Sequence, residues 1–243
     1  MAAAYDRGMP PVAAYLDYNA TTPVDPAVLE AMLPFLAEHF GNPSSGHAWG
    51  ARARAAVGEA RSRVAAFLGA RPEEVVFTSG GTESDNAGVL GAARARRGRG
   101  RHVVTSAVEH PAVLEPCALL ESEGFRVTRV PVDADGRVAP RDVASALTDE
   151  TVLVSVMHAN NEVGTLQDIA EIARLARARG ALVHTDAAQS AGKVPVDVGA
   201  LGVDLLSLAG HKLYAPKGVG ALWVRSGVAI DRFLLGAGHE SGR

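Results

Sequence analysis

The chain has little cysteine, few aromatic residues and no long apolar run. Its 243 residues include one cysteine, Cys117, and only 5% are aromatic. A single cysteine excludes an internal disulfide and any metal site built from several cysteines, and it fits a reducing cytoplasm. No apolar run reaches about 18 residues, and the first residues do not read as a signal peptide. We therefore expect a cytoplasmic protein that does not enter a membrane.

The chain also lacks a strong charge of either sign, and it is poor in lysine. A net charge of -3 gives no electrostatic reason to expect nucleic acid or an anionic membrane as a partner. Of the 24 basic residues, 21 are arginines, and the only lysines are Lys193, Lys212 and Lys217. The search for a catalytic amine is thus limited to three positions. The apolar fraction of 47% is ordinary for a globular protein with a sizeable core.

Short β-branched runs alternate with helical stretches along most of the chain. This alternation predicts an α/β fold, with a mostly parallel seven-stranded sheet covered by helices on both faces. The last two expected strands lie close together, which favours an antiparallel strand there. The expected strands are Glu74–Thr78, His102–Thr105, Arg126–Val130, Val152–Met157, Leu182–Thr185, Asp204–Leu208 and Val219–Val224. The expected helices between them are Glu83–Arg97, Ala112–Glu123, Pro140–Leu147 and Asp168–Arg179.

The part of the chain before these strands has a different pattern. It contains two expected helices, Pro26–Phe40 and Ala48–Leu68, and a short run, Tyr15–Tyr18, that favours a strand. We therefore divide the chain into an N-terminal segment, residues 1–25, and one large domain, residues 26–243.

Glycines and polar residues follow several of the expected strands. Ligands of α/β proteins gather at the carboxyl ends of strands, so these residues are candidates for a site. Gly81 and Thr82, in a Gly-Gly-Thr sequence that leads into a helix, suit a phosphate, although a Gly-Gly turn by itself is more often only a tight turn with a helix cap. His110 begins a helix and offers either an acid/base group or a flat stacking surface, or is only a satisfied polar residue. Asn160 and Asn161 serve a turn or bind a ligand oxygen.

Two further strand ends carry charged residues. Asp186 follows an apolar run, and a buried carboxylate there requires a cationic or hydrogen-bonded partner, unless it caps a helix. Lys212 follows another apolar run, so burial is expected to lower its pKa and make it a usable amine nucleophile. Lys217, beside proline and glycine, is expected in an exposed turn, and Lys193 is expected at the end of a helix. Lys212 is therefore the choice for a Schiff base.

Together these groups meet the requirements of pyridoxal phosphate. The cofactor needs a lysine for a Schiff base, a carboxylate for its pyridinium nitrogen, a cradle for its phosphate and a flat surface for its ring. The order of these motifs along one α/β chain is a stronger signal than any of them alone. We expect pyridoxal phosphate as the cofactor and no metal.

With these motifs in place, the sequence resembles the cysteine desulfurase and selenocysteine lyase branch of the class V aminotransferase family. These are pyridoxal-phosphate enzymes of fold type I, and the resemblance runs from about Tyr15 to the end of the chain. The motifs that carry it are Tyr18–Pro23, Gly41–Ser45, Thr78–Ser84, Glu109–His110, Asn160–Glu162, His184–Gln189 and Gly210–Lys212.

The resemblance implies roles for three residues around the cofactor ring, catalytic for Lys212 and His110 and cofactor-binding for Asp186. Lys212 would hold the cofactor and later move the α-proton of the substrate. Asp186 would pair with the pyridine nitrogen. His110 would stack on the ring and assist proton transfer.

The resemblance also implies five binding residues. Gln189 and Asn161 would lie near the ring hydroxyl oxygen, whereas Gly81, Thr82 and His211 would contact the phosphate. Ala209 departs from the family pattern, which commonly has a phosphate-binding serine three residues before the lysine. The loss of one hydrogen bond to a charged group costs roughly 1.5–3 kcal/mol.

The activity that the resemblance implies is the conversion of L-cysteine to L-alanine. In such enzymes a mobile cysteine takes the sulfur as a persulfide. The resemblance also implies a homodimer and an acceptor protein that receives the sulfur, as in iron–sulfur cluster assembly. We expect that cysteine and a small C-terminal domain to lie beyond Arg243, since Cys117 reads as a small buried residue. Two alternatives stay open: a selenocysteine lyase or other class V enzyme, and a truncated chain that binds the cofactor without turnover.

Overall fold

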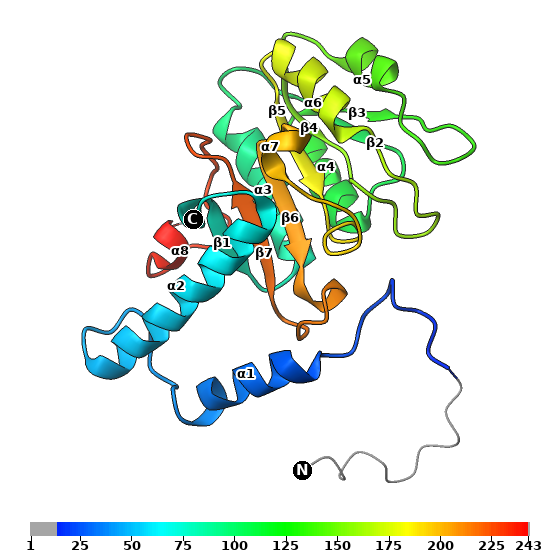
Figure 1. Cartoon of the computed structure of the whole chain (residues 1–243). Helices are drawn as coiled ribbons and strands as arrows, with labels where there is room; N and C mark the ends of the chain where they lie inside the picture. The colour runs from blue at the N-terminus through cyan, green and yellow to red at the C-terminus, as the bar shows by residue number, and fades with distance from the viewer. Residues whose placement is uncertain (1–13, 243) are drawn as a thin grey trace.

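A seven-stranded sheet forms the centre of the molecule in the computed structural model, which describes residues 14–242 (Figure 1). Its strand order is β1-β7-β6-β5-β4-β2-β3. The strands are β1 (Val75–Thr78), β2 (His102–Ser106), β3 (Arg126–Val130), β4 (Thr151–Ser155), β5 (Leu182–Asp186), β6 (Leu205–Ala209) and β7 (Gly220–Val224). Within the sheet, β7 alone is antiparallel to its neighbours, β1 and β6. The carboxyl ends of the other six strands therefore meet at one edge.

Helices cover both faces of this sheet, as predicted. On one face lie α3 (Gly81–Ala95) and α4 (Pro111–Ser122), and on the other lie α5 (Pro140–Ala146), α6 (Ile169–Ala178) and α7 (Val198–Leu201), with the end of α2 (Ala48–Leu68). Successive residues of β7 alternate between the two cores: Leu222 and Val224 pack with α3, and Ala221 and Trp223 pack on the opposite face. The α/β fold with a mostly parallel sheet is thus confirmed.

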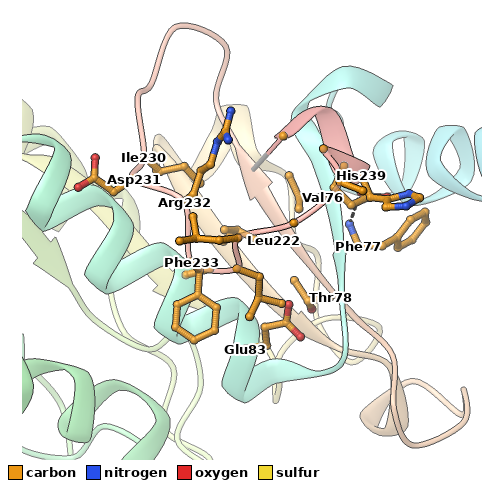
Figure 2. A pocket seen from close by; sticks show the side chains of 18 residues that line it. Val76, Phe77, Thr78, Glu83, Leu222, Ile230, Asp231, Arg232, Phe233 and His239 are labelled. Carbon is orange, nitrogen blue, oxygen red and sulfur yellow. Dashed lines mark hydrogen bonds between the residues drawn. The ribbon is translucent and has the colours of Figure 1, made fainter. Parts of the chain in front are cut away.

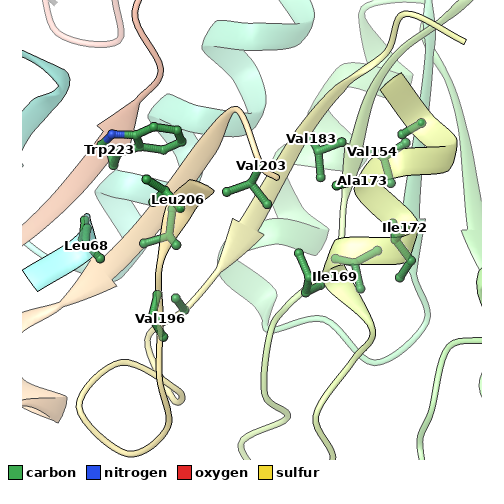
Figure 3. Packing of buried hydrophobic residues seen from close by; sticks show 14 of the residues in the cluster. Leu68, Val154, Ile169, Ile172, Ala173, Val183, Val196, Val203, Leu206 and Trp223 are labelled. Carbon is green, nitrogen blue, oxygen red and sulfur yellow. The ribbon is translucent and has the colours of Figure 1, made fainter. Parts of the chain in front are cut away.

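The core under α6 illustrates how these layers are held together. Ile169, Ile172 and Ala173 lie on one side of α6 and face Val154 and Val183 of the sheet (Figure 3). Their spacing of three and four residues places them on one helical stripe. All five are essentially inaccessible to water. Burial of each larger side chain stabilises the fold by about 1.5–3 kcal/mol.

The first helix, α1 (Pro26–Ala37), has a different environment. It lies apart from the sheet in Figure 1 and none of its residues is buried. Leu29, Leu33 and Leu36 are exposed on its surface. At the other end of the described chain, the short α8 (His239–Gly242) lies beside α2 and β1, where Glu240 pairs with Arg61 of α2 at 2.6 Å.

The segment before α1 crosses the loop after β6. The amide of Thr22 donates to the carbonyl of His211 at 3.0 Å, and the amide of Asp25 donates to the carbonyl of Tyr214 at 2.9 Å. The predicted strand at Tyr15–Tyr18 is wrong, because residues 14–17 form no regular structure and residues 18–20 form a turn. The backbone of this segment is satisfied at separate points of a loop rather than along a strand edge.

Candidate active site

A cavity of about 240 Å³ opens at the carboxyl edge of the sheet. All eight residues predicted to bind a cofactor or act in catalysis line this cavity: Gly81, Thr82, His110, Asn161, Asp186, Gln189, His211 and Lys212. They come from five different strand ends and lie together because β1, β2, β4, β5 and β6 run in one direction. Ala20, Asp85, Met157, Ala188 and Ala209 complete the lining.

Lys212 ends a single helical turn, Gly210–Lys212, that directly follows β6. Its ammonium group donates to the carbonyl of Ala20 at 3.0 Å and to the carbonyl of Asn19. Burial lowers the pKa of Lys212, and the positive charge of Lys193 lowers it further, against the opposing charge of Asp186. The lowered pKa increases the fraction of free amine, which is the nucleophilic form.

Asp186 is the last residue of β5 and is only 6% exposed. One of its oxygens accepts the amide of Ala188 at 2.8 Å. Burial raises the pKa of Asp186, although the Ala188 amide and the charges of His110 and Lys212 oppose that shift. The alternative that Asp186 caps a helix is wrong, because turns occupy residues 188–193. A cationic group of a ligand would therefore be stabilised next to this buried carboxylate.

The first turn of α3 forms another wall of the cavity. Gly81 is its first residue, and the leading amides of a helix point outward without intrahelical partners. A Cβ atom added to Gly81 would lie 3.2 Å from the Cβ of Ala209, so the helix begins close against the end of β6. His211 lies on the same wall and shares a hydrogen bond with the Thr21 hydroxyl at 3.1 Å. These groups suit an anionic ligand.

His110 and the two asparagines resolve alternatives that the sequence left open. His110 caps α4, and its Nδ1 accepts the amide of Ala112 at 3.1 Å, while the ring lines the cavity. Asn160 is buried and serves the turn, because its side-chain oxygen accepts the amides of Glu162 and Val163 at 2.9 and 3.0 Å. Asn161 instead lines the cavity. Only the second asparagine is therefore available to a ligand.

The N-terminal segment contacts Lys212, Gln189 and Lys193, and these contacts were not predicted. The carbonyl of Asn19 accepts hydrogen bonds from Lys212 and, at 2.9 Å, from the Gln189 amide. The side chain of Lys193 donates to Gln189 at 2.8 Å and to the Asn19 side chain at 3.3 Å. Lys193 lies in a turn and not at a helix end as predicted. The sequence Asn-Ala-Thr-Thr-Pro was the available signal, but the hydrogen bonds of Asn19 with this part of the site span more than 140 residues of sequence.

Glu109 is a buried residue that joins two of the loops around the cavity. It accepts the Ser106 hydroxyl at 2.5 Å and the Met157 amide at 2.9 and 3.0 Å. Burial raises the pKa of Glu109 to about 8. Because Glu109 takes the amide of Met157, that residue leaves the strand ladder, and β4 ends at Ser155, two residues before the predicted end.

Cys117 lies inside α4 and is completely buried, as predicted. Burial raises the pKa of its thiol to about 12. A buried thiol of this kind is almost entirely protonated at neutral pH and is a poor nucleophile.

A second cavity, of about 250 Å³, is lined partly by β1 and shares no lining residue with the first (Figure 2). The stretch from Ile230 to Gly242 closes it against β1, β7 and α3. Val76, Phe77, Leu222 and Phe233 give it a largely apolar wall. It contains no lysine, so the predicted chemistry belongs to the first cavity.

Two features are absent from residues 14–242. No helix in this range is both long and apolar enough to cross a bilayer. No group of three or more histidines, cysteines or acids in the same range is placed to hold a metal ion.

Comparison with known proteins identifies the family of this chain. The family model described as Aminotransferase class-V matches residues 14–241. The chain is 51% identical to the cysteine desulfurase IscS of Dictyoglomus turgidum over 229 residues, or 94% of this chain and 58% of the relative. It is also 51% identical to the cysteine desulfurase IscS of Methanosarcina thermophila over 231 residues, or 95% of this chain and 57% of the relative.

A solved structure titled "SspA in complex with cysteine" has the same fold. It superposes with a TM-score of 0.91 at 43% identity, and the match covers 94% of this chain and 66% of that one. The chain thus spans less than two thirds of the length of each of these relatives. The family match over nearly the whole chain and the shared fold lead to one conclusion: the chain belongs to the class V aminotransferase family and is similar to the cysteine desulfurases within it.

Proposed function

We propose that this chain binds pyridoxal phosphate in the cavity around Lys212 and forms the cofactor-binding part of a cysteine desulfurase. The reaction converts L-cysteine to L-alanine and passes the sulfur, as a persulfide, to an acceptor thiol. The observation that carries this proposal is that Lys212 and Asp186 line one cavity with the N-terminus of α3. An amine, a buried acid and an anion-binding helix start are the three groups that the cofactor requires.

The residues of the cavity fit the cofactor group by group. Asp186 would pair with the ring nitrogen, and the imidazole of His110 would stack on the ring. Asn161 and Gln189 present amides for the ring oxygen. For the phosphate, the chain offers the first amides of α3 at Gly81, the hydroxyl of Thr82 and the ring of His211. When bound, pyridoxal phosphate supplies an electron sink next to the amino group of the substrate.

Lys212 is also placed to handle a proton. The carbonyls of Asn19 and Ala20 hold its amine in one position above the cavity. Because burial and the charge of Lys193 lower its pKa, the amine can take the α-proton of an amino acid at Nζ and later return it. His110 lies on the same cavity and is the second group able to assist.

The proposed substrate is L-cysteine. Support comes from the similar SspA, whose structure is described as a complex with cysteine, and from relatives named cysteine desulfurase. L-Selenocysteine is the alternative substrate, since nothing in the described cavity selects sulfur over selenium. We further propose a homodimer, because exposed Leu29, Leu33 and Leu36 give α1 an apolar surface suited to a partner, and a cytoplasmic location.

One observation favours a second candidate function. Cys117 is the only cysteine of the 243 residues, and it is fully buried with a raised pKa. The sulfur acceptor must therefore be a thiol outside this sequence. By itself, the polypeptide would then bind the cofactor and the amino acid without completing persulfide transfer.

The test is an absorbance titration of the purified chain with pyridoxal phosphate. We expect a visible band of protein-bound cofactor that Lys212→Ala abolishes and that Lys217→Ala, a control at an exposed lysine, retains. Addition of L-cysteine with an external thiol should then yield alanine and sulfide. A folded chain without a cofactor band would contradict the proposal, whereas a band without alanine formation would favour the second candidate.

A further inference from the structure

The face of α3 that lies on the sheet carries an acid between two glycines. Gly81, Asp85 and Gly88 are spaced by four and three residues, so they lie on one stripe of the helix. A Cβ atom added to Gly88 would lie 3.0 Å from Cδ2 of His184 on β5. The missing side chains let the helix approach the sheet closely. This close approach brings Asp85 to the cavity, which it lines.

Asp85 is almost fully enclosed, and its own hydrogen bonding is incomplete. It is 2% exposed and lines the cavity. Among residues 14–242, its Oδ1 atom has no hydrogen-bond partner. The closest ring nitrogen, Nε2 of His184, lies 3.6 Å away. That ring already bonds the Ser207 hydroxyl at 2.9 Å and the Ser155 hydroxyl at 2.8 Å. A buried carboxyl with this little support is costly unless it serves a ligand or stays uncharged.

The charged groups around Asp85 favour the uncharged form. His184 is neutral, because full burial lowers its pKa to about 3. The other titratable groups that act on Asp85 are acids, Asp186 on β5 and Glu109 after β2. Burial and these two acids raise the pKa of Asp85 well above its ordinary value, against one opposing hydrogen bond from Ser207.

Asp186 differs from Asp85 in its partners. The Ala188 amide donates to Asp186, and the positive charge of Lys212 acts on this acid. No arginine or lysine within residues 14–242 forms an ion pair with either acid. When two buried acids share one site, the better supported one ionises and the other keeps its proton. The support lies with Asp186.

We propose that Asp85 is a positioning residue of the cofactor site, a neutral acid that stands beside Asp186 and leaves it as the single negative charge facing the ring nitrogen. This inference rests on the proposed function for its ligand, pyridoxal phosphate. It assigns Asp85 no contact with the reacting atoms. A neutral acid both donates and accepts hydrogen bonds, and an asparagine side chain of the same shape can do the same.

The test compares Asp85→Asn with the wild-type chain in two measurements. In the cofactor-free protein, thermal unfolding is followed from pH 5 to pH 9. An acid whose folded pKa is raised contributes stability at low pH and loses it as the pH rises. Asp85→Asn should therefore reduce the fall in melting temperature with rising pH. Asp85→Ser, which also lacks a titratable group, should give the same flattened profile.

The second measurement is the affinity for pyridoxal phosphate at pH 7, read from the absorbance of the bound cofactor. Asp85→Asn, which keeps a neutral side chain of the same shape, should leave the dissociation constant within about threefold of the wild-type value, whereas the shorter side chain of Asp85→Ser should weaken binding. A loss of more than about threefold in Asp85→Asn, or equal affinities in Asp85→Ser and the wild-type chain, would overturn the proposal. A pH profile as steep as that of the wild-type chain in both variants would overturn it as well.

Asp204→Asn is the matched control, since Asp204 is a buried acid at the opposite end of the sheet. It should lower the melting temperature at every pH and leave cofactor affinity unchanged. The failures are separable, because the pH profile needs no cofactor. A wild-type chain that binds no pyridoxal phosphate would overturn the proposed function, whereas an unflattened profile would overturn the account of Asp85.

Discussion

The two ends of the sheet both bury acids, but they support them in opposite ways. At the amino end, Glu74 and Asp204 lie immediately before β1 and β6 and are held by arginines. At the carboxyl end, Asp85 and Asp186 line a cavity and Glu109 joins two of the loops beside it, and none of the three forms an ion pair with arginine or lysine in the described chain. The same residue type is thus part of the scaffold at one end and a candidate for function at the other.

The acids of the amino end are fully supported. Asp204 accepts the Val183 amide at 2.8 Å and pairs with Arg225 at 2.5 Å and Arg177 at 3.3 Å. Burial alone would raise the pKa of Glu74, but hydrogen bonds from Arg71, the Ser226 amide and the Trp223 ring hold it at about 2. Such an acid stabilises the fold above its unfolded pKa of about 4.5, and loses that contribution as the pH falls toward 2.

The acids of the carboxyl end shift the other way. The pKa values of Asp85, Glu109 and Asp186 are all raised, chiefly by burial. Each such acid reduces the stability of the cofactor-free fold at neutral pH. Acids with raised pKa values that gather at one cavity mark it as a candidate functional site. The contrast therefore locates the site independently of any sequence motif.

The largest effect on stability should come from the amino end. Asp204→Asn removes the charge that holds Arg177 and Arg225, so we expect a loss of roughly 2–4 kcal/mol in the free energy of unfolding. Urea denaturation at pH 7 measures it. If Asp204→Asn left the free energy of unfolding unchanged or raised it, the acids of the amino end would not support the fold as proposed.

The next effect should appear as a pH dependence at the carboxyl end. Glu109, with a pKa near 8 in the fold, holds its proton more tightly than in the unfolded chain. Its contribution is present below about pH 4.5 and is lost as the pH rises through 8. Glu109→Gln should reduce the loss of unfolding free energy between pH 5 and pH 8 by at least about 1 kcal/mol. Urea denaturation at the two pH values measures this loss. A loss equal to that of the wild-type chain would refute this assignment.

A smaller effect is expected at Ala209, which packs against Gly81 where α3 begins. Ala209→Ser introduces a hydroxyl at the wall proposed to bind phosphate. One hydrogen bond to a charged group should tighten pyridoxal phosphate by about tenfold with little change in stability. Absorbance titration measures the change, and Ala188→Ser, another position on the cavity lining, is the control. Equal affinities for Ala209→Ser and the wild-type chain would place the phosphate elsewhere.

Much of this fold could be predicted from the sequence, because its signals are local. The strands show as short β-branched runs, and α2 begins and ends where its pattern does, at Ala48 and Leu68, before Gly69 with a φ of +68°. The candidate site could be predicted because its residues follow strand ends, and a parallel sheet brings strand ends together. The resemblance to a known family then assigned roles to individual residues.

Other features could not be predicted, because they depend on contacts between distant segments. The backbone of Asn19 binds Lys212, a contact that spans 193 residues. The failed strand at Tyr15–Tyr18 has the same cause, since this segment is held by the loop after β6. Asp85 lies inside a helix with no local sign of function. Its role emerges only when the close packing of α3 on the sheet places it in the cavity floor.

Asp186→Asn tests most directly whether Asp186 serves a ligand or the scaffold, with two measurements on one sample. We expect the cofactor-free variant to be more stable than the wild-type chain at pH 7, because burial raises the pKa of Asp186 and an acid with a raised pKa reduces stability at neutral pH. We also expect that the affinity for pyridoxal phosphate falls by about a hundredfold or more, as the partner of the ring nitrogen is lost. A variant that is less stable and binds the cofactor as well as the wild-type chain would show that Asp186 belongs to the scaffold, and would contradict the central claim.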